Sequence, residues 1–176
     1  MSGMSNLTQQ NRESSTRGDV RTELKPRLNW DKASPGVRNA MLGLGKYLQT
    51  TSLESSLKNL VLIRASQLNG CAYCLDMHTK DARAEGESEE RLYLISGWRE
   101  APFYTERERA ALAWTEAVTL VADSHVPDDV YEEARKYFDE KDLVDLTLAI
   151  IEINGWNRLN VSFRNIAGSY KPMRKG

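Results

Sequence analysis

Apolar residues recur at helical spacing along most of the chain, and polar residues divide them into segments. Ser34-Pro35 suits the start of a helix, and apolar positions then recur three and four residues apart as far as Leu48. Further helices are expected over about 52–68, 71–85, 92–98, 105–120, 127–138, 139–154 and 156–163. Strand alternation bounded by turns is absent from the sequence pattern, so the predicted fold class is all-α.

Turn and capping residues set the expected helix ends. Thr105 with Glu108 forms a capping box, and Gly86 suits the end of the helix expected over 71–85. Asn69-Gly70 and Asn154-Gly155 each follow an apolar helix and are both expected to end it, with the next helix beginning at once. This similarity predicts a weak internal helix-turn-helix repeat. Chance is the alternative explanation for two Asn-Gly dipeptides.

The length of 176 residues fits one domain with a substantial core. We expect a flexible tail over 1–22, the helical domain over 23–168 and a short basic tail over 169–176. The 24 Lys and Arg residues nearly balance the 25 Asp and Glu residues, so no nucleic-acid or anionic-membrane partner is indicated. The sequence has no apolar run of membrane-spanning length and no secretory signal, and a cytoplasmic location is therefore expected.

The two cysteines of the chain, Cys71 and Cys74, are separated by two residues, and His78 follows four residues after Cys74. On a helix the three positions fall within an arc of about 60° and face one side. The first turn of a helix favours a thiolate, and His78 stands at i,i+4 from Cys74. We therefore expect redox chemistry, in which Cys74 attacks and Cys71, nearer the helix end and solvent, resolves the product as a disulfide.

Three other interpretations of this cluster compete with redox chemistry. Zinc would find three ligands in the two cysteines and the histidine, but a closed site would need a further carboxylate. Covalent haem needs a histidine directly after the second cysteine, where Leu75 stands, and is rejected. The cysteines would otherwise be small buried hydrophobic residues. The favoured interpretation includes no metal and no cofactor.

The segment from Leu60 to His78 closely resembles the alkylhydroperoxidase D (AhpD)-like branch of the carboxymuconolactone decarboxylase family. The segments 98–109 and 157–161 are similar to the same branch, and the resemblance covers most of 28–163. It implies an AhpD-like helical bundle that assembles as a homo-oligomer, a trimer or a hexamer. It also implies a thiol-dependent peroxidase that reduces a hydroperoxide substrate.

In that resemblance each site residue has an implied role. Cys74 attacks the hydroperoxide and becomes a sulfenic acid, Cys71 condenses with it, and an external dithiol reduces the disulfide. His78 belongs to a proton relay. The family's relay glutamate, twelve residues before the first cysteine, is replaced here by Asn59, which exchanges no proton under ordinary conditions.

Several substitutes for that glutamate remain open. Either His78 acts alone, or another carboxylate approaches, or peroxidase turnover is weak. Asp76 points away from the pocket on a helical wheel, and Glu54 is the better substitute. Two alternative functions also remain: a lyase acting on a cyclic lactone, which would not need the cysteines, and a non-enzymatic redox-sensing or scaffold protein.

Other residues have more than one interpretation. Tyr73, between the cysteines, either donates a hydrogen bond to a substrate or packs at an interface. His125 is expected in a loop. Arg64 and Arg158 lie in otherwise apolar helices and are expected to pair with carboxylates across the fold or between subunits.

Overall fold

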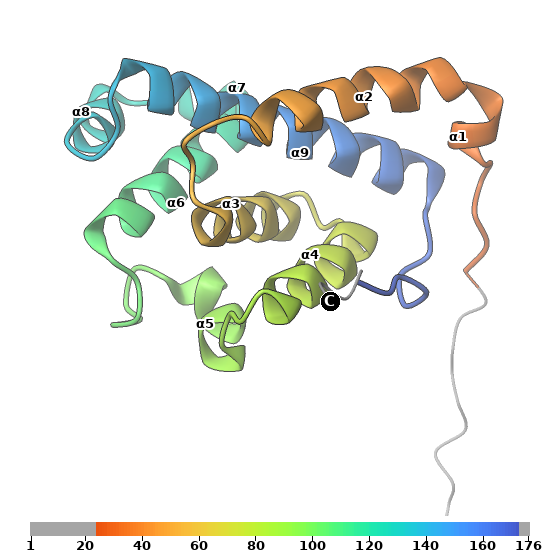
Figure 1. Ribbon diagram of the computed structural model, residues 1–176, viewed down its shortest axis with the longest axis horizontal. Coiled ribbons are helices and arrows are strands. Elements are labelled where there is room, and N and C mark those ends of the chain that lie inside the picture. Colours follow the sequence, from red (N-terminus) through yellow and green to blue (C-terminus); the bar gives the residue numbers. More distant parts are fainter. Residues whose placement is uncertain (1–23, 173–176) are drawn as a thin grey trace, which may run out of the picture.

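The computed structural model describes residues 24–172, and all regular structure in this range is helical (Figure 1). The elements are α1 (Trp30–Ala33), α2 (Pro35–Leu48), α3 (Ser55–Leu68), α4 (Ala72–Ala84), α5 (Glu89–Leu94), a 3₁₀ turn (Ile95–Gly97), α6 (Glu106–Thr119), α7 (Val121–Ser124), α8 (Asp128–Arg135) and α9 (Glu140–Phe163). The predicted all-α class is confirmed. The tail expected over 1–22 and residues 173–176 of the C-terminal tail lie outside the described residues.

Helix α3 is the centre of the fold, and α4, α6 and α9 pack around it (Figure 1). Leu57 and Val61 point into one apolar cluster with residues of α6, α8 and α9. Leu60 and Ile63 point into a second cluster, with residues of α4 to α6. A helix that is buried on several sides has no polar face of its own, and its position depends on its neighbours.

The predicted capping box closes the start of α6. The Thr105 hydroxyl accepts from the backbone N–H of Glu108, and the Glu108 carboxylate accepts from the backbone N–H of Thr105. Asp139 caps α9, with its carboxylate accepting from the Asp142 N–H at 2.7 Å. These local signals fix the starting residues of both helices, because each satisfies backbone donors that the helix leaves unpaired.

The two Asn-Gly dipeptides behave differently. Asn69-Gly70 ends α3 as predicted, and Gly70 has a positive φ of 63° that suits glycine. The break predicted at Asn154-Gly155 is wrong, because both residues lie inside the single 24-residue helix α9. The Asn69 side chain donates to Asn154 Oδ1 at 3.0 Å, so the two dipeptides meet in space. The internal repeat itself stays a prediction.

Close packing explains why α9 continues through Gly155. A Cβ atom at Gly155 would lie 2.7 Å from Cε of Met41 in α2, so glycine allows the two helices to approach. Asn154 keeps helical geometry while its side chain donates to the Ile150 carbonyl within the helix. Contact with α2 therefore outweighs the low helix propensity of glycine, which costs about 1 kcal/mol relative to alanine.

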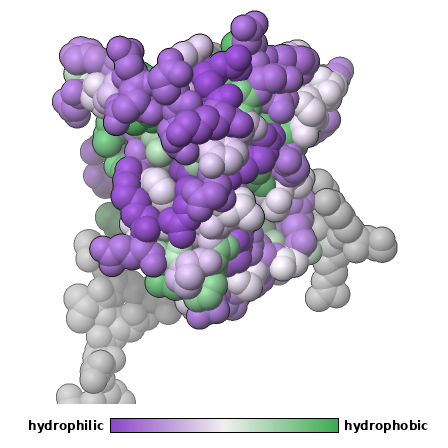
Figure 2. Space-filling model, turned by 90° about the vertical axis from the view of Figure 1, so that its left-hand side faces the viewer, coloured by the Kyte–Doolittle hydropathy of each residue, from purple (hydrophilic) through white to green (hydrophobic). Residues whose placement is uncertain are grey.

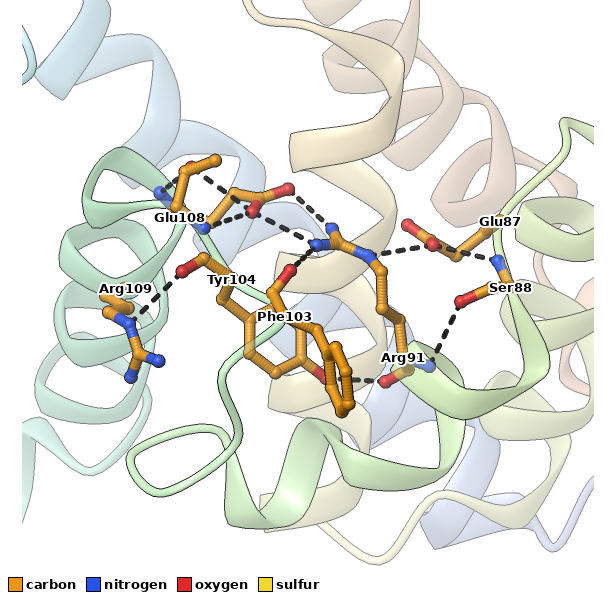
Figure 3. A network of polar contacts seen from close by, with 8 residues as sticks. Glu87, Ser88, Arg91, Phe103, Tyr104, Glu108 and Arg109 are labelled. Carbon is orange, nitrogen blue, oxygen red and sulfur yellow. Dashed lines mark hydrogen bonds and ion pairs between the residues drawn. The ribbon is translucent and has the colours of Figure 1, made fainter.

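A polar network ties α5 to α6, and we call it the α5–α6 corner (Glu87, Arg91, Tyr104 and Glu108). Arg91 pairs with Glu87 at 2.9 Å and with Glu108 at 2.6 Å, and it donates to the Phe103 carbonyl (Figure 3). The Tyr104 hydroxyl donates to the Arg91 carbonyl. Every charged group of this corner has a partner, as a structural network requires.

The two arginines of the apolar helices have different partners. Arg64 pairs with Glu116 of α6 at 2.8 Å, which confirms the expected ion pair. Arg158 is exposed, and its hydrogen-bond acceptors among the described residues are the two oxygens of Asn154. Pairing of Arg158 with a carboxylate within the described chain is therefore not seen, because its side chain lies at the surface of α9. Pairing between subunits stays a prediction.

Among residues 24–172 no helix is both long and apolar enough to cross a lipid bilayer. The side of the molecule that carries α8 and α6 has a mainly hydrophilic surface (Figure 2). Large exposed apolar side chains are found elsewhere as well, including Val144 and Ile151 of α9.

Candidate functional site

The two cysteines lie at the start of α4, directly after the turn that ends α3. They are joined by a disulfide, and their Cα atoms are 5.3 Å apart. Cys71 is the N-cap residue of α4, and its sulfur accepts from the backbone N–H of Cys74 at 3.3 Å. The turn at Gly70 and the first turn of α4 therefore place both sulfurs together without any contribution from another element. The expected proximity of the cysteines is confirmed.

Both sulfurs are buried in this disulfide form. Cys71 is 1% exposed and Cys74 is 0% exposed, and they pack with Ala65 and Ile153 in a small apolar cluster. The expectation that Cys71 would lie nearer solvent is wrong. Cys71 is buried because α9 crosses over the start of α4 and covers the N-terminal end of α4.

Asn160 of α9 supplies a polar contact to the pair. Its side-chain Nδ2 donates to Cys74 Sγ at 3.3 Å, and its Oδ1 accepts from Asn165 at 2.6 Å. The second bond fixes the orientation of the amide, so that its donor faces the sulfur. A donor directed at a thiolate favours the charged form and lowers a thiol pKa.

Asn160 belongs to a row of asparagines along α9. Asn157 accepts from Asn69 at 2.9 Å and donates to the Ser66 hydroxyl at 3.1 Å, while Asn154 accepts from Asn69 at 3.0 Å. These bonds connect α9 to the end of α3, directly before the cysteines. The row therefore sets the position of the turn from which α4 begins.

His78 lies one turn after Cys74 on α4 and borders a cavity. Its Nε2 atom is buried and has no hydrogen-bond partner among the described residues. Burial lowers the pKa of His78 to about 4, so the imidazole is neutral near pH 7. A neutral, unpartnered imidazole is able to accept a proton from a group that enters the cavity.

Two cavities meet at His78. The first cavity has a volume of about 520 Å³ and is lined by Tyr73, Met77 and Trp156 among its apolar residues, with Asn160 at its wall. The second cavity has a volume of about 490 Å³. Their sizes and the apolar lining of the first one, with a few polar groups, are typical of small-molecule sites.

Aromatic side chains close one side of the first cavity. Trp30 of α1 packs against Trp156 with ring centroids 5.9 Å apart. Tyr73 is half-buried at the cavity wall, which fits a contact with a substrate better than a fully buried core position. His125 is exposed and ends α7 in a left-handed conformation, outside both cavities.

The carboxylates considered as relay substitutes have other partners. Glu54 pairs with Arg107 of α6 at 3.4 Å and lines neither cavity. Asp76 pairs with Lys80 at 2.7 Å and accepts from the backbone N–H of Gly168. Asn59 borders the second cavity. The structure thus directs Glu54 away from His78, because the start of α3 faces α6.

Sequence reasoning missed two residues of this site, Asn160 and Glu152. Glu152 lies on α9 and borders both cavities together with His78. A signal for Asn160 was present in the polar residues at 154, 157 and 160, which recur every three positions in an apolar helix. The break expected at Gly155 divided this pattern between two helices and concealed it.

The fold and site define a class of helical protein with a cysteine pair at a helix start beneath a mainly apolar cavity. The profile of the family described as "Carboxymuconolactone decarboxylase family" matches residues 35–117. The chain is 40% identical over 146 residues to the uncharacterised protein YdfG of Bacillus subtilis (strain 168). This match covers 83% of this chain and 99% of that protein. The chain belongs to the carboxymuconolactone decarboxylase family, and its likeness is to the AhpD-like members.

Two solved structures support the same assignment at different levels. A protein of unknown function from Agrobacterium tumefaciens, described as a candidate antioxidant defence protein AhpD, is 45% identical with a TM-score of 0.80. The match covers 83% of this chain and 100% of that one. The debrominase Bmp8 is 22% identical with a TM-score of 0.71, over 78% of this chain and 74% of that one, and shows the shared fold alone.

Proposed function

We propose that the protein is a thiol-dependent peroxidase that reduces hydroperoxides through a Cys74/Cys71 disulfide cycle. The observation that carries the proposal is the pair of cysteines bonded to each other at the start of α4, next to a mainly apolar cavity. The resemblance of this segment to the AhpD-like branch of the family implies a peroxidase site with such a cysteine pair. The similarity to the candidate antioxidant protein of Agrobacterium tumefaciens supports it.

The chemistry begins with the reduced pair. The Cys74 thiolate attacks the distal oxygen of a hydroperoxide ROOH, the O–O bond breaks, and Cys74 sulfenic acid and an alkoxide form. The alkoxide takes the proton that the Cys74 thiol released and leaves as the alcohol ROH. The Cys71 thiolate then attacks the Cys74 sulfur, and hydroxide leaves and takes the Cys71 proton as water.

An external dithiol closes the cycle. One of its thiolates attacks the protein disulfide and displaces one cysteine as a thiolate, which forms a mixed disulfide with the other. The second thiolate of the reductant attacks the reductant sulfur of that mixed disulfide and displaces the other cysteine. Both cysteines take up the protons that the reductant released, and the reductant leaves as a disulfide. Asn160 supports the role of Cys74 as the attacking group, because its amide donates to that sulfur at 3.3 Å. A homo-oligomer, a trimer or a hexamer, and a cytoplasmic location complete the proposal.

Stopped-flow oxidation of the reduced protein by tert-butyl hydroperoxide tests the assignment. We expect the parent protein to be oxidised rapidly and Cys74→Ser to be inert. Cys71→Ser should form a sulfenic acid that dimedone traps, without a disulfide between the pair. Oxidation of Cys74→Ser at the rate of the parent would exclude the proposed role.

The complete burial of both sulfurs favours one alternative, in which the disulfide serves as a redox sensor. This alternative predicts an oligomer whose size changes with dithiothreitol while peroxide consumption stays negligible. Light scattering on the oxidised and reduced protein, together with the peroxide assay, separates the two functions. Lactone turnover that survives removal of both cysteines would instead indicate a lyase.

A further inference from the structure

Glu152 lies at the junction of the two cavities, opposite α4, where no sequence signal placed an acid. We propose that Glu152 is the second proton-transfer residue of the site and exchanges protons with His78 during peroxide reduction. This inference rests on the proposed peroxidase function. It places the relay carboxylate on α9, whereas the position of the family's relay glutamate, here Asn59, lies on α3.

The geometry of the cavities carries the proposal. Leu62, His78 and Glu152 line both cavities, so these three side chains form the wall between them. Of the other acids in the described cavity walls, Asp31 borders the first only, and Asp81 and Glu85 border the second only. Glu152 is therefore the acid that shares with His78 both the space for a substrate and the second cavity.

Glu152 is held in place by two neighbouring helical residues. Trp156 donates its indole N–H to Glu152 Oε1 at 3.2 Å, one turn further along α9. A Cβ atom at Gly45 of α2 would lie 2.7 Å from the same oxygen. A glycine in the middle of α2 costs helix stability, and here it provides the room that the carboxylate occupies.

The environment shifts the proton affinities of the two groups in opposite directions. Burial raises the pKa of Glu152, although the Trp156 hydrogen bond and the charge of Lys58 on α3 oppose the rise. Burial lowers the pKa of His78 to about 4. The imidazolium therefore gives up a proton more readily, and the carboxylate takes one up more readily, than either group does in water.

Charged groups on the surrounding elements do not replace Glu152. In the first cavity, Asp31 and Arg38 hydrogen-bond to each other at 3.4 Å. In the second cavity, Asp81 accepts from the Tyr170 hydroxyl at 2.7 Å, and Glu85 accepts from the Asn59 amide at 2.9 Å. Among the described residues, Glu152 accepts its hydrogen bond from the Trp156 indole N–H, through Oε1.

One proton moves from Cys74 to the leaving alkoxide through His78 and Glu152. The Cys74 thiol gives its proton to the His78 imidazole, and the imidazolium passes it to the Glu152 carboxylate. The thiolate breaks the O–O bond, and the leaving alkoxide takes the proton from the Glu152 carboxylic acid. The site returns to its starting protonation state, with one hydroperoxide converted to one alcohol and Cys74 to the sulfenic acid.

The pH dependence of single-turnover oxidation by tert-butyl hydroperoxide tests the role of Glu152. We expect Glu152→Gln to slow the reaction at pH 7 by about 100-fold, the lower range for loss of general acid–base catalysis. Its rate profile should also lose the ionisation that Glu152 contributes. Glu152→Asp keeps the acid and should recover part of the rate, which a purely structural role would not require.

A matched pair of glycine variants tests the position of the carboxylate without removing it. Gly45→Ala should displace Glu152 and slow oxidation, whereas Gly43→Ala has open space in the same helix and should leave the rate unchanged. Both substitutions raise the helix propensity of α2, so stability alone cannot separate them. Circular dichroism confirms that each variant is folded.

The outcomes distinguish this inference from the proposed function. Rates and pH profiles of Glu152→Gln and Gly45→Ala that match the parent, while Cys74→Ser is inert, would overturn the role of Glu152 alone. An active Cys74→Ser variant would overturn the peroxidase function itself.

Discussion

The α5–α6 corner and the cysteine site both bury polar groups. In the corner these groups are paired, whereas at the cysteine site one buried nitrogen has no partner. In the corner, Arg91 has two carboxylate partners and a backbone carbonyl (Figure 3). Burial would raise the pKa of Glu108, but hydrogen bonds from Arg91 and the Thr105 backbone outweigh it and lower the pKa. At the cysteine site, Nε2 of His78 is buried without a partner.

The difference separates groups that stabilise the fold from groups that are available for reaction. A satisfied ion pair is held in one charge state, whereas an unpartnered imidazole beside a cavity is costly to the fold and open to a ligand. The following predictions test this distinction, beginning with the largest expected effect.

Replacing Arg91 should damage the fold more than the chemistry. Arg91→Met leaves Glu87 and Glu108 without their partner, and we expect a loss of roughly 3 kcal/mol in the free energy of unfolding. Urea denaturation measures it. Arg83→Met is the matched control, because its ion pair with Glu89 is exposed and should change stability by less than about 1 kcal/mol. Equal losses in both variants would contradict the structural role of the corner.

His78 should make the protein sensitive to acid. Its pKa is lowered to about 4 in the folded state from an ordinary value of 6.5, so the unfolded chain binds the proton first. The stability is therefore fully present above about pH 6.5 and falls as the pH drops toward 4, by roughly 3 kcal/mol in total. Urea denaturation of the parent and of His78→Gln between pH 7 and 4.5 measures the difference. Parallel pH profiles would show that His78 does not titrate in this way.

Asn160 should tune the attacking thiol. Asn160→Asp replaces the amide that faces Cys74 Sγ with a carboxylate, which repels a thiolate. We expect the pKa of Cys74 to rise by about one unit and the rate of peroxide oxidation at pH 7 to fall about tenfold. Thiolate absorbance against pH, measured in the Cys71→Ser background, reports Cys74 alone. An unchanged thiol pKa would remove Asn160 from the mechanism.

The capping box should give the smallest effect. Thr105→Ala removes the side-chain acceptor for the Glu108 N–H, and we expect a loss of about 1 kcal/mol in unfolding free energy. The rate of oxidation by tert-butyl hydroperoxide should stay that of the parent. A slower reaction in this variant would mean that the corner and the cysteine site are coupled.

Local signals predicted much of the fold because they act over a few residues. Pro35, Thr105 and Asp139 mark the starts of α2, α6 and α9. The proline ring restricts φ at the first helical position, and the other two side chains accept from their own first turns. The signal failed at Asn154-Gly155, where contact between Gly155 and Met41 of α2 decided the outcome. A dipeptide pattern contains no information about the helix that packs on it.

The candidate site was predictable to a similar extent. The spacing of Cys71, Cys74 and His78 predicted a cysteine pair at a helix start, and the pair is joined there. The burial of Cys71 and the direction of Glu54 were not predictable, because both depend on which helix crosses the start of another.

The sequence by itself determined the helices, the turn at Gly70 and the closeness of the two sulfurs, since hydrogen bonds and steric limits within a few residues fix them. Only the tertiary structure decided that α9 brings Asn160 to Cys74 and Glu152 to the wall beside His78. These contacts join residues more than 70 positions apart, and burial of apolar surface among α2, α3, α4 and α9 holds them together.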